Sequence, residues 1–357
     1  MKIIHTADLH IDSPLTSKLP RDKARERRSE LLSNLSRLVS EARRLEASAI
    51  IIAGDLFDSS SVRQTAKAAL YDTVRGARDI AFFYLQGNHD AGVIEELGLS
   101  ELENFYTFPE DSWKYYGLGS EVTLCGRGAC CDGMFDELKL DKTKKNIVVL
   151  HGELRERSAA PETVGISDAA QKNIDYLALG HYHSYGETRI DPRGVAVYSG
   201  TPEGRGFDET GECGFVLIDT DNSISHKFIP FAKRKTHIVR LDLTNLRNAT
   251  DIIDYAERAL LGIPRCDIVR LELCGYYTLG LWRDTASLEH RLSDRFYYFE
   301  IKDSSRISVR AEDYKNDKSL KGEFIRLILA EPTLDGETKE KIIACGINAL
   351  MGEEYGG

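Results

Sequence analysis

The chain has 357 residues, 42% of them hydrophobic and 29% charged, a balance typical of a folded globular protein. Its formal net charge of −10 argues against a protein that coats nucleic acid by bulk electrostatics, although residues 21–28, 142–145 and 233–235 could form local basic surface. No apolar run approaches the ~18–20 residues of a membrane span. With no signal peptide and seven cysteines that form no CxxC pair, we expect a cytoplasmic protein with no membrane partner.

Short apolar segments alternate with amphipathic ones over the first 180 residues. The predicted strands are residues 2–6, 49–53, 80–85, 146–150 and 176–180, and the predicted helices are about 20–46 and 62–78. Strands that are apolar throughout and separated by helices indicate an α/β sheet covered on both faces. After residue 194, short segments with Gly and Asp turns predict a second sheet.

The sequence predicts three domains: a first domain at 1–232, a small α+β capping domain at 236–312 and a helical tail at 316–357. The capping domain follows from a strand–helix–strand–helix–strand pattern after the basic residues 233–235. The tail holds two amphipathic helices. Their predicted apolar faces are Leu320, Phe324, Leu327 and Ile328 in one helix, and Ile343, Ile347 and Leu350 in the other.

Polar residues follow five of the predicted strands at the point where each strand ends. They are Asp8, His10, Asp55, Asp58, Asn88, His89, Asp90, His151, His181 and His183. Because the carboxyl ends of strands in an open α/β sheet line one crevice, we expect these side chains to meet. Alternation would put His181 and His183 on the same side of an extended chain. A single H-x-H motif after a strand fits an ordinary polar loop. The recurrence of Asp, Asn and His at five successive strand ends favours a metal site.

The candidate ligands are carboxylates, an amide oxygen and imidazoles, with no thiolate. Such donors suit Mn²⁺, Fe²⁺ or Zn²⁺ and argue against a structural zinc. Seven ligands are too many for one ion with an open position and about right for two. Two ions ~3.5–4 Å apart clamp the oxygens of a phosphoester and turn a shared water into a nucleophile. Asp55, after the second strand, is well placed to serve both ions.

The motifs D-x-H, G-D-x-x-D, G-N-H-D, H-G and G-H-x-H, in this order, resemble those of the calcineurin-like metallophosphoesterase superfamily over residues 1 to about 230. The resemblance implies a two-sheet sandwich flanked by helices. It also implies two metals bridged by Asp55. The implied ligands are Asp8, His10, Asp55 and His183 for one ion, and Asp55, Asn88, His151 and His181 for the other.

The resemblance also implies roles for residues beside the metals. His89 would face the substrate phosphate as general acid or charge stabiliser, and Asp58 would orient its imidazole. Some relatives carry His where this chain has Asp58. Asp90 could belong to the site or could cap the next helix, and we favour the cap.

Finer features are similar to the DNA repair exonuclease branch, the nuclease subunit of SbcCD-type double-strand-break repair complexes. The opening IIHTADLHIDSPL is one of them. Another is the segment 198–215, in which Thr201 and Arg205 take the places of a serine and an arginine, with Glu209 or Asp208 as the acid. Arg205 would bind substrate phosphate or, equally, hold an acid at the base of the turn. A capping domain and a helical tail are also features of that branch, and the resemblance implies a capping or DNA-binding role for residues 236–312.

The resemblance implies a DNA exo/endonuclease for end processing and repair, nucleoid-associated, with two Mn²⁺ ions per chain and Fe²⁺, Zn²⁺ or Mg²⁺ as alternatives. The chain has no Walker motif, so ATP coupling would come from an SMC-like coiled-coil ATPase partner. The tail would dock on that partner or pack on its own domain, and a homodimer is compatible with the sequence. The alternatives are a stand-alone metallophosphodiesterase acting on small nucleotides and a non-catalytic scaffold. The complete ligand set argues against the scaffold.

Overall fold

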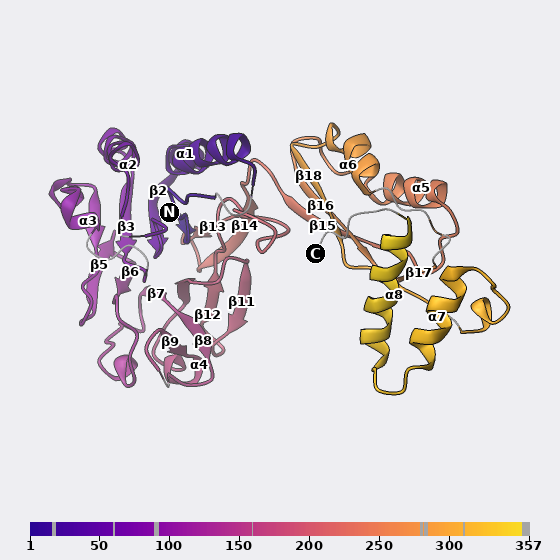
Figure 1. Ribbon diagram of the computed structural model, residues 1–357. Helices are drawn as coiled ribbons and strands as arrows, with labels where there is room; N and C mark the ends of the chain where they lie inside the picture. Colours follow the sequence, from indigo (N-terminus) through magenta and orange to yellow (C-terminus); the bar gives the residue numbers. More distant parts are fainter. Residues whose placement is uncertain are drawn as a thin grey trace. The chain divides into compact units, whose positions relative to one another are not determined.

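The computed structural model describes residues 1–357 except 16–18, 60, 89–92, 159, 279–280, 282–284, 310 and 352–357. The chain divides into two compact units, Met1–Thr236 and His237–Gly357 (Figure 1). None of the helices in the described ranges is long and apolar enough to cross a membrane. The finer division into three domains stays a prediction.

Two six-stranded sheets form the centre of the first unit. The first, in the order β14-β13-β1-β2-β3-β4, contains β1 (Lys2–Thr6), β2 (Ala47–Ala53), β3 (Ala81–Leu85), β4 (Phe105–Thr107), β13 (Gly214–Asp219) and β14 (Ser225–Pro230). The second, in the order β11-β12-β10-β7-β6-β5, contains β5 (Lys114–Leu118), β6 (Val122–Gly126), β7 (Lys145–His151), β10 (Tyr176–Gly180), β11 (Gly186–Arg189) and β12 (Val195–Tyr198). Strands β1 to β4 run parallel, whereas β13 pairs antiparallel with β1. The predicted two-sheet α/β fold is confirmed.

The assignment of strands to the two sheets was wrong in part. Strands β7 and β10, expected beside β1 to β3, belong to the second sheet, and β13 and β14, expected in the second, extend the first. The central strands of both sheets have buried side chains on both faces, so an apolar run fits either sheet. The strand pairings decide the matter: β13 pairs with β1, where Lys2 lies opposite Asp219, whereas β7 pairs with β6 and β10.

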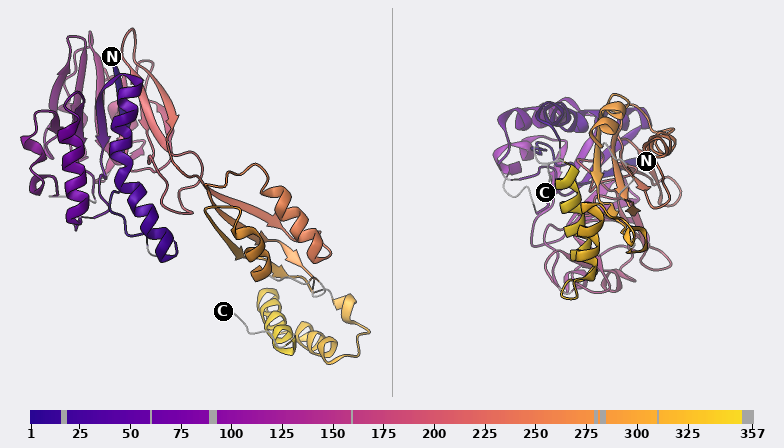
Figure 2. Two further views of the ribbon diagram at one scale, coloured as in Figure 1. Left: turned by 90° about the horizontal axis from the view of Figure 1, so that it is seen from above. Right: turned by 45° about the vertical axis from the view of Figure 1, so that its right-hand side comes forward.

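Alternating side chains of the first sheet serve two different cores. Ile3, Ile51 and Phe83 point to the second sheet and pack there with residues such as Val149 and Tyr176. The intervening side chains, Ile4, Ile50 and Ile52 among them, pack in the core under the helices. Those helices, α1 (Arg21–Leu45) and α2 (Gln64–Gly76), lie side by side along the outer face of the first sheet (Figure 2).

Short elements complete the first unit, and some of them cover part of the outer face of the second sheet. They are α3 (Val93–Glu96), η1 (Leu99–Glu101), η2 (Met134–Asp136), β8 (Glu153–Arg155), β9 (Thr163–Gly165) and α4 (Ile166–Ala169). Met134 and Phe135 of η2 and Ala169 of α4 pack against Leu150 and Leu177 of the second sheet. The second sheet therefore has a loop-covered outer face, in contrast to the helix-covered first sheet.

The second unit begins with a three-stranded sheet and two helices. The elements are β15 (Thr236–Asp242), α5 (Ala249–Ala259), β16 (Ile268–Cys274), α6 (Thr285–Ser293) and β18 (Tyr298–Asp303), with β17 (Tyr276–Tyr277) and β19 (Arg306–Ile307) as a small separate pair. This is the strand–helix–strand–helix–strand order that the sequence predicts. Then follow η3 (Ala311–Tyr314), α7 (Leu320–Ala330) and α8 (Gly336–Met351).

Helices α7 and α8 pack against each other through Ile325, Ile343 and Ile347, with Phe324 and Ile328 partly buried beside them. The predicted apolar face of α7 is divided, because Phe324 and Ile328 pack on the tail while Leu320 and Leu327 are 69% and 65% exposed. Ile325, absent from the prediction, takes the centre of the contact. The side chain of Leu350 lies outside the described residues.

A buried ionic cluster fastens α1 to two later segments of the first unit. Arg27, on α1, is 1% exposed and lies 2.9 Å from Glu203, and it donates to the carbonyl oxygen of Gly204 at 2.7 Å. Arg234 contacts Glu30 at 2.8 Å. The expectation of basic surface at 21–28 and 233–235 is therefore wrong for Arg27 and Arg234, whose charges are paired inside the unit.

Replacing Arg27 with Met should destabilise the first unit by roughly 3–5 kcal/mol, because removal of one partner leaves Glu203 buried with less compensation. Arg43→Met is the matched control in the same helix, since Arg43 pairs with Asp79 at the surface, where an ion pair contributes little. Urea unfolding of both variants tests this. An equal loss in both would contradict the structural role of the cluster.

Candidate metal centre

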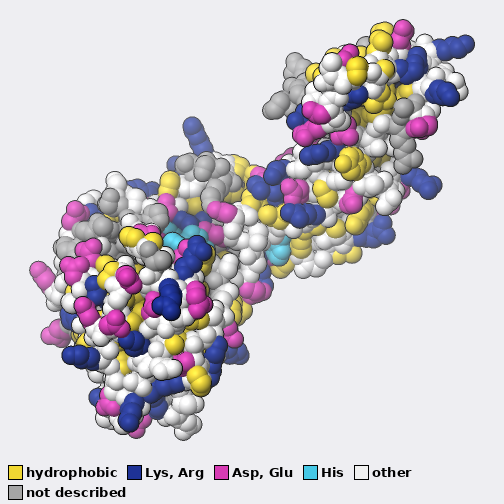
Figure 3. Space-filling model, turned by 90° about the horizontal axis from the view of Figure 1, so that it is seen from below, with side chains coloured by type: hydrophobic (Ala, Val, Ile, Leu, Met, Phe, Trp, Pro, Cys, Tyr) yellow, Lys and Arg dark blue, Asp and Glu magenta, His cyan; other side chains and the backbone are white. Residues whose placement is uncertain are grey.

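The carboxyl ends of β1, β2, β7 and β10 bring their polar residues together although the strands belong to two sheets. Asp8 and His10 follow β1, Asp55 follows β2, and His151 is the last residue of β7. Backbone hydrogen bonds of 3.1 Å join Asp8 to Gly54 and His10 to Asp55, so the two loops run together. Figure 3 shows histidine side chains reaching the surface, with basic side chains beside them.

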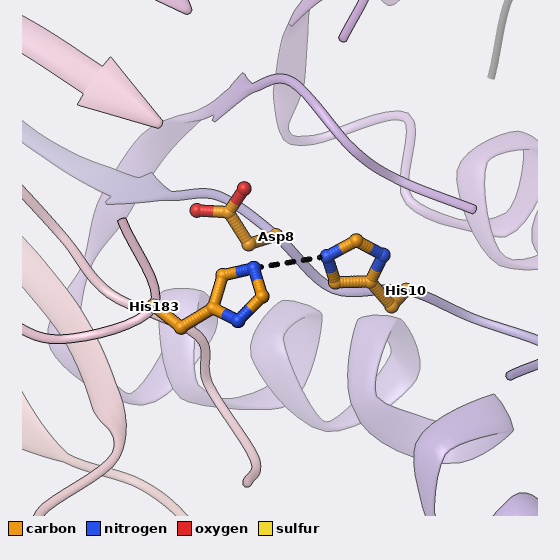
Figure 4. Close-up of side chains that lie close together, drawn as sticks. All are labelled: Asp8, His10 and His183. Carbon is orange, nitrogen blue, oxygen red and sulfur yellow. Dashed lines mark hydrogen bonds between the residues drawn. The ribbon is translucent and has the colours of Figure 1, made fainter. Parts of the chain in front are cut away.

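One cluster with the geometry of a metal site consists of Asp8, His10 and His183, each of which offers a ligand atom within 4.8 Å of the others. The side chains converge in Figure 4, where Nε2 of His10 faces Nε2 of His183 at 3.3 Å. On the other side of each ring, Nδ1 of His10 lies 3.3 Å from Asp58, and Nδ1 of His183 lies 2.9 Å from Glu209. A carboxylate at Nδ1 favours the proton there and directs the Nε2 lone pair towards a cation.

A second cluster consists of Asp8, Asp55 and His151. Nδ1 of His151 lies 2.9 Å from the carbonyl oxygen of Ala53, which can only accept, so this imidazole also carries its proton on Nδ1. Its Nε2 lies 3.5 Å from Oδ2 of Asp55, and the same oxygen is 4.0 Å from Nε2 of His10. Asp8 belongs to both clusters, whereas Asp55 belongs to the second and approaches His10 of the first. The bridging role expected of Asp55 stays a prediction.

The electrostatics of the two clusters fit divalent cations. Burial, and next the charge of Asp55, raise the pKa of Asp8 well above its usual value. Burial also lowers the pKa of His10, which keeps its imidazole neutral as a ligand must be. Two buried carboxylates with neutral imidazoles around them need positive charge to stay ionised together. The donor set thus fits two metal ions, with three imidazoles aimed inward by their outer hydrogen-bond partners.

His181 and Asn88 lie beside the second cluster. The backbone N–H of His181 donates to both carboxylate oxygens of Asp8 at 3.1 Å, and its ring stands edge-on to that of His151 at 5.5 Å. Burial, followed by the charge of His151, lowers the pKa of His181. Asn88 lines a hollow of about 510 Å³ together with His151. His181 has a φ of 104°, so the extended geometry expected for His181 and His183 is wrong, and His183 joins the first cluster.

Asp58 and Arg205 form part of the layer behind the histidines. Asp58 lies 3.3 Å from His10 and 2.6 Å from Arg205, and its contact with His10, before that with Arg205, lowers its pKa. Its predicted partner His89 lies outside the described residues, as does Asp90, so the roles of both stay predictions. Arg205 contacts Glu209 at 2.8 Å, which is the second of the two alternatives for this arginine. Its contact with substrate phosphate stays a prediction.

Glu209 is the functional residue that sequence reasoning found only as one of two candidate acids. Although burial opposes its ionisation, the hydrogen bond with His183 and then the charge of Arg205 lower its pKa to about 2. The carboxylate therefore stays ionised and can hold both partners. Thr201, at the place of the family serine, donates to the carbonyl oxygen of Asp8 at 2.9 Å. The spacing of Thr201, Arg205 and Glu209 was the signal for this layer.

The backbone at the strand ends takes conformations that side chains rarely adopt. Asp8, His10 and Asp55 have φ values of 51°, 43° and 48°. Such left-handed backbone is costly and clusters at functional sites, where the surroundings must impose it. Gly54 and Gly87 permit the close approach, because a Cβ at Gly54 would overlap the imidazole of His151, and one at Gly87 would overlap Asp55. These two glycines explain the G in the G-D and G-N motifs.

Comparison with known proteins agrees with this geometry. The family model for calcineurin-like phosphoesterases matches residues 1–185, so the chain belongs to this family. Its site and family define a metal-dependent phosphoesterase, a hydrolase.

Individual relatives are distant. The chain is 26% identical to an uncharacterized metallophosphoesterase, YhaO, of Bacillus subtilis, over 77% of this chain and 72% of that protein. It is 25% identical to the DNA double-strand break repair protein Mre11 of Sulfurisphaera tokodaii, over 69% of this chain and 67% of that protein. Among solved structures, TT1561 of Thermus thermophilus matches 64% of this chain and 98% of its own, with 13% identity and a TM-score of 0.41.

Two divalent ions bound here would supply a nucleophile at neutral pH and neutralise charge that develops on the phosphoester. The chain contributes the geometry of the ligands. Asp8 and Asp55 provide negative charge at the clusters, and His10, His151 and His183 offer Nε2 as the ligand atom, because Nδ1 of each ring faces an acceptor. Glu209 and Asp58 hold His183 and His10 in orientation, and Arg205 pairs with both of these acids and balances their charge.

Replacing Glu209 with Gln should lower the affinity for one of two Mn²⁺ ions by roughly 10–100-fold, the usual effect of losing the partner of a ligating histidine. Gln has nearly the same shape as Glu, but it removes the negative charge that lies beside His183 and Arg205. Glu212→Gln, an exposed acid of the same loop that pairs with Lys235, is the control and should leave the affinity unchanged. Calorimetric titration with Mn²⁺ measures both. Unchanged binding in Glu209→Gln would show that the His183 contact has no part in metal binding.

Proposed function

We propose that the protein is a two-metal-dependent DNA exo/endonuclease that hydrolyses phosphodiester bonds in DNA end processing and repair, with Mn²⁺ as its metal. The dinuclear arrangement of Asp8, Asp55 and three histidines supports phosphoester hydrolysis. The similarity to Mre11 supports the substrate, because it extends over 272 residues and so exceeds the 185 residues of the family match. Such a nuclease would work with DNA in the cytoplasm, associated with the nucleoid.

In this proposal Asp8, His10, Asp55 and His183 bind one ion. Asp55, Asn88, His151 and His181 bind the other. His89 acts as general acid or charge stabiliser beside the phosphate. Arg205 is foremost a positioning residue, because its described side-chain hydrogen bonds go to Asp58 and Glu209. A guanidinium has five N–H donors, so contact with substrate phosphate is compatible with these bonds.

Labelled linear duplex and hairpin DNA should be degraded in the presence of Mn²⁺ and left intact without it. The variant Asp55→Ala, which removes the oxygens between the two clusters, should be inactive on both substrates, and this controls for a contaminating nuclease. An aryl phosphodiester is tested in parallel. Hydrolysis of the aryl phosphodiester with both DNAs intact would contradict the nuclease proposal and favour the stand-alone small-nucleotide phosphodiesterase.

We also propose that the tail docks on an SMC-like coiled-coil ATPase. Helix α7 uses Ile325 for packing on α8, yet it exposes Leu320 and Leu327. These leucines are two turns apart on the helix, so they form an apolar stripe on one side. A helical partner that presents its own apolar stripe would cover them.

The double variant Leu320→Ser, Leu327→Ser should retain metal binding and hydrolysis of the aryl phosphodiester but lose association with an SMC-like ATPase of the same organism in a pull-down. Leu261→Ser is the matched control, because Leu261 is another exposed leucine of the second unit, at 69%. It should be captured like the wild type. Capture of the double variant at wild-type levels would refute this docking surface.

A further inference from the structure

Tyr182 stands between two histidines of the metal centre and contributes no predicted ligand. Its ring is edge-on to the ring of His181, with centroids 5.5 Å apart, although Tyr182 remains 43% exposed. In an extended segment, alternation would turn this side chain away from the site. The left-handed backbone of His181 removes that alternation, so the aromatic ring lies at the margin of the metal centre.

The ring is held in place from two sides. Its hydroxyl donates to Oε1 of Glu153 at 2.7 Å. Tyr198 packs against it nearly at a right angle, with centroids 4.9 Å apart. Tyr198 is itself fixed, because its hydroxyl donates to the carbonyl oxygen of Gly152 at 2.8 Å and accepts from the backbone N–H of Leu154 at 2.7 Å. The segment 152–154 and Tyr182 are therefore fastened to the same buried tyrosine.

Glu153 also holds a cation beside the ring. Its Oε2 lies 2.7 Å from Arg155, whose side chain is 61% exposed. One carboxylate thus positions an exposed aromatic ring and an exposed guanidinium next to each other. The pairing uses part of the guanidinium, and its other N–H groups can donate to a further acceptor.

An aromatic ring and a guanidinium side by side match the two halves of a nucleotide. Unpaired bases stack on aromatic side chains, and arginine N–H groups bind phosphate oxygens. Stacking on a neutral ring adds attraction that does not depend on the charge of the protein, whose net charge is −10. A paired base inside a duplex offers no free face, so this chemistry selects a single-stranded nucleotide.

We propose that Tyr182 and Arg155, positioned by Glu153, form a subsite for an unpaired nucleotide next to the scissile phosphodiester. The base stacks on Tyr182 and an adjacent phosphate binds Arg155. The inference rests on the proposed function in one respect, namely that the substrate is a nucleic acid. It adds that the strand must be frayed or single-stranded where it enters the site.

Binding of a single-stranded oligonucleotide with phosphorothioate linkages, which resist cleavage, and one 2-aminopurine near its end tests the subsite. Stacking on Tyr182 should quench the 2-aminopurine fluorescence of the bound oligonucleotide. Tyr182→Ala should abolish the quenching and weaken binding by roughly 5–150-fold, the range of base stacking on an aromatic side chain. Tyr182→Phe keeps the ring and should preserve the quenching. Arg155→Ala should weaken binding and make the affinity less dependent on salt concentration than that of the wild type, because one phosphate contact is lost.

Tyr115→Ala is the matched control, because Tyr115 is 41% exposed and belongs to β5, three strands from β10 in the same sheet. It should bind like the wild type. Wild-type quenching in Tyr182→Ala would overturn the proposal. Loss of bound Mn²⁺ together with loss of oligonucleotide binding in Tyr182→Ala would also overturn it, because the ring would then act only by supporting His181.

Failure of the subsite and failure of the nuclease proposal are distinguishable. A wild-type protein that quenches 2-aminopurine but leaves every DNA intact would contradict the nuclease and support the subsite. A wild-type protein that degrades DNA while Tyr182→Ala binds the oligonucleotide normally would support the nuclease and contradict the subsite.

Discussion

Two buried carboxylates in one place are the constraint on which the metal centre depends. Asp8 and Asp55 end neighbouring strands and share a cluster with His151, and the charge of one raises the pKa of the other. Such a pair is unfavourable in a protein interior unless positive charge lies between its members. Protonation of one carboxylate would relieve the repulsion, but a protonated carboxyl group is a poor metal ligand. A pair of divalent cations relieves it and gives the site its chemistry.

The surrounding layer explains why this unfavourable pair persists. Each imidazole of the clusters is turned by an acceptor at Nδ1: Asp58 for His10, the Ala53 carbonyl for His151 and Glu209 for His183. Arg205 joins two of those acceptors, and the adjoining Gly204 is bound by Arg27 of helix α1. The orientation of the ligands is therefore connected to the buried ionic cluster, and through it to the packing of α1 on the first sheet.

The sequence indicated which polar side chains would lie near one another, because strand ends are readable from apolar runs and the candidate ligands stand at or just after them. Asp8, His10, Asp55, His151 and His183 do lie together. The distribution of strands between sheets was not predictable, since β7 and β13 are equally apolar and only long-range pairing separates them. Contacts made across the fold were missed for the same reason. Arg27 reads as surface charge until Glu203 is placed beside it, and nothing in the sequence around Asp58 indicates its contact with His10.

The central claim is that the chain holds two metal ions with Asp55 between them. Anomalous scattering from crystals grown with Mn²⁺ tests it most directly. The account predicts two peaks about 3.5–4 Å apart, one beside His10 and His183 and one beside His151, with Asp55 in contact with both. A single peak, or two peaks of which only one touches Asp55, would contradict it.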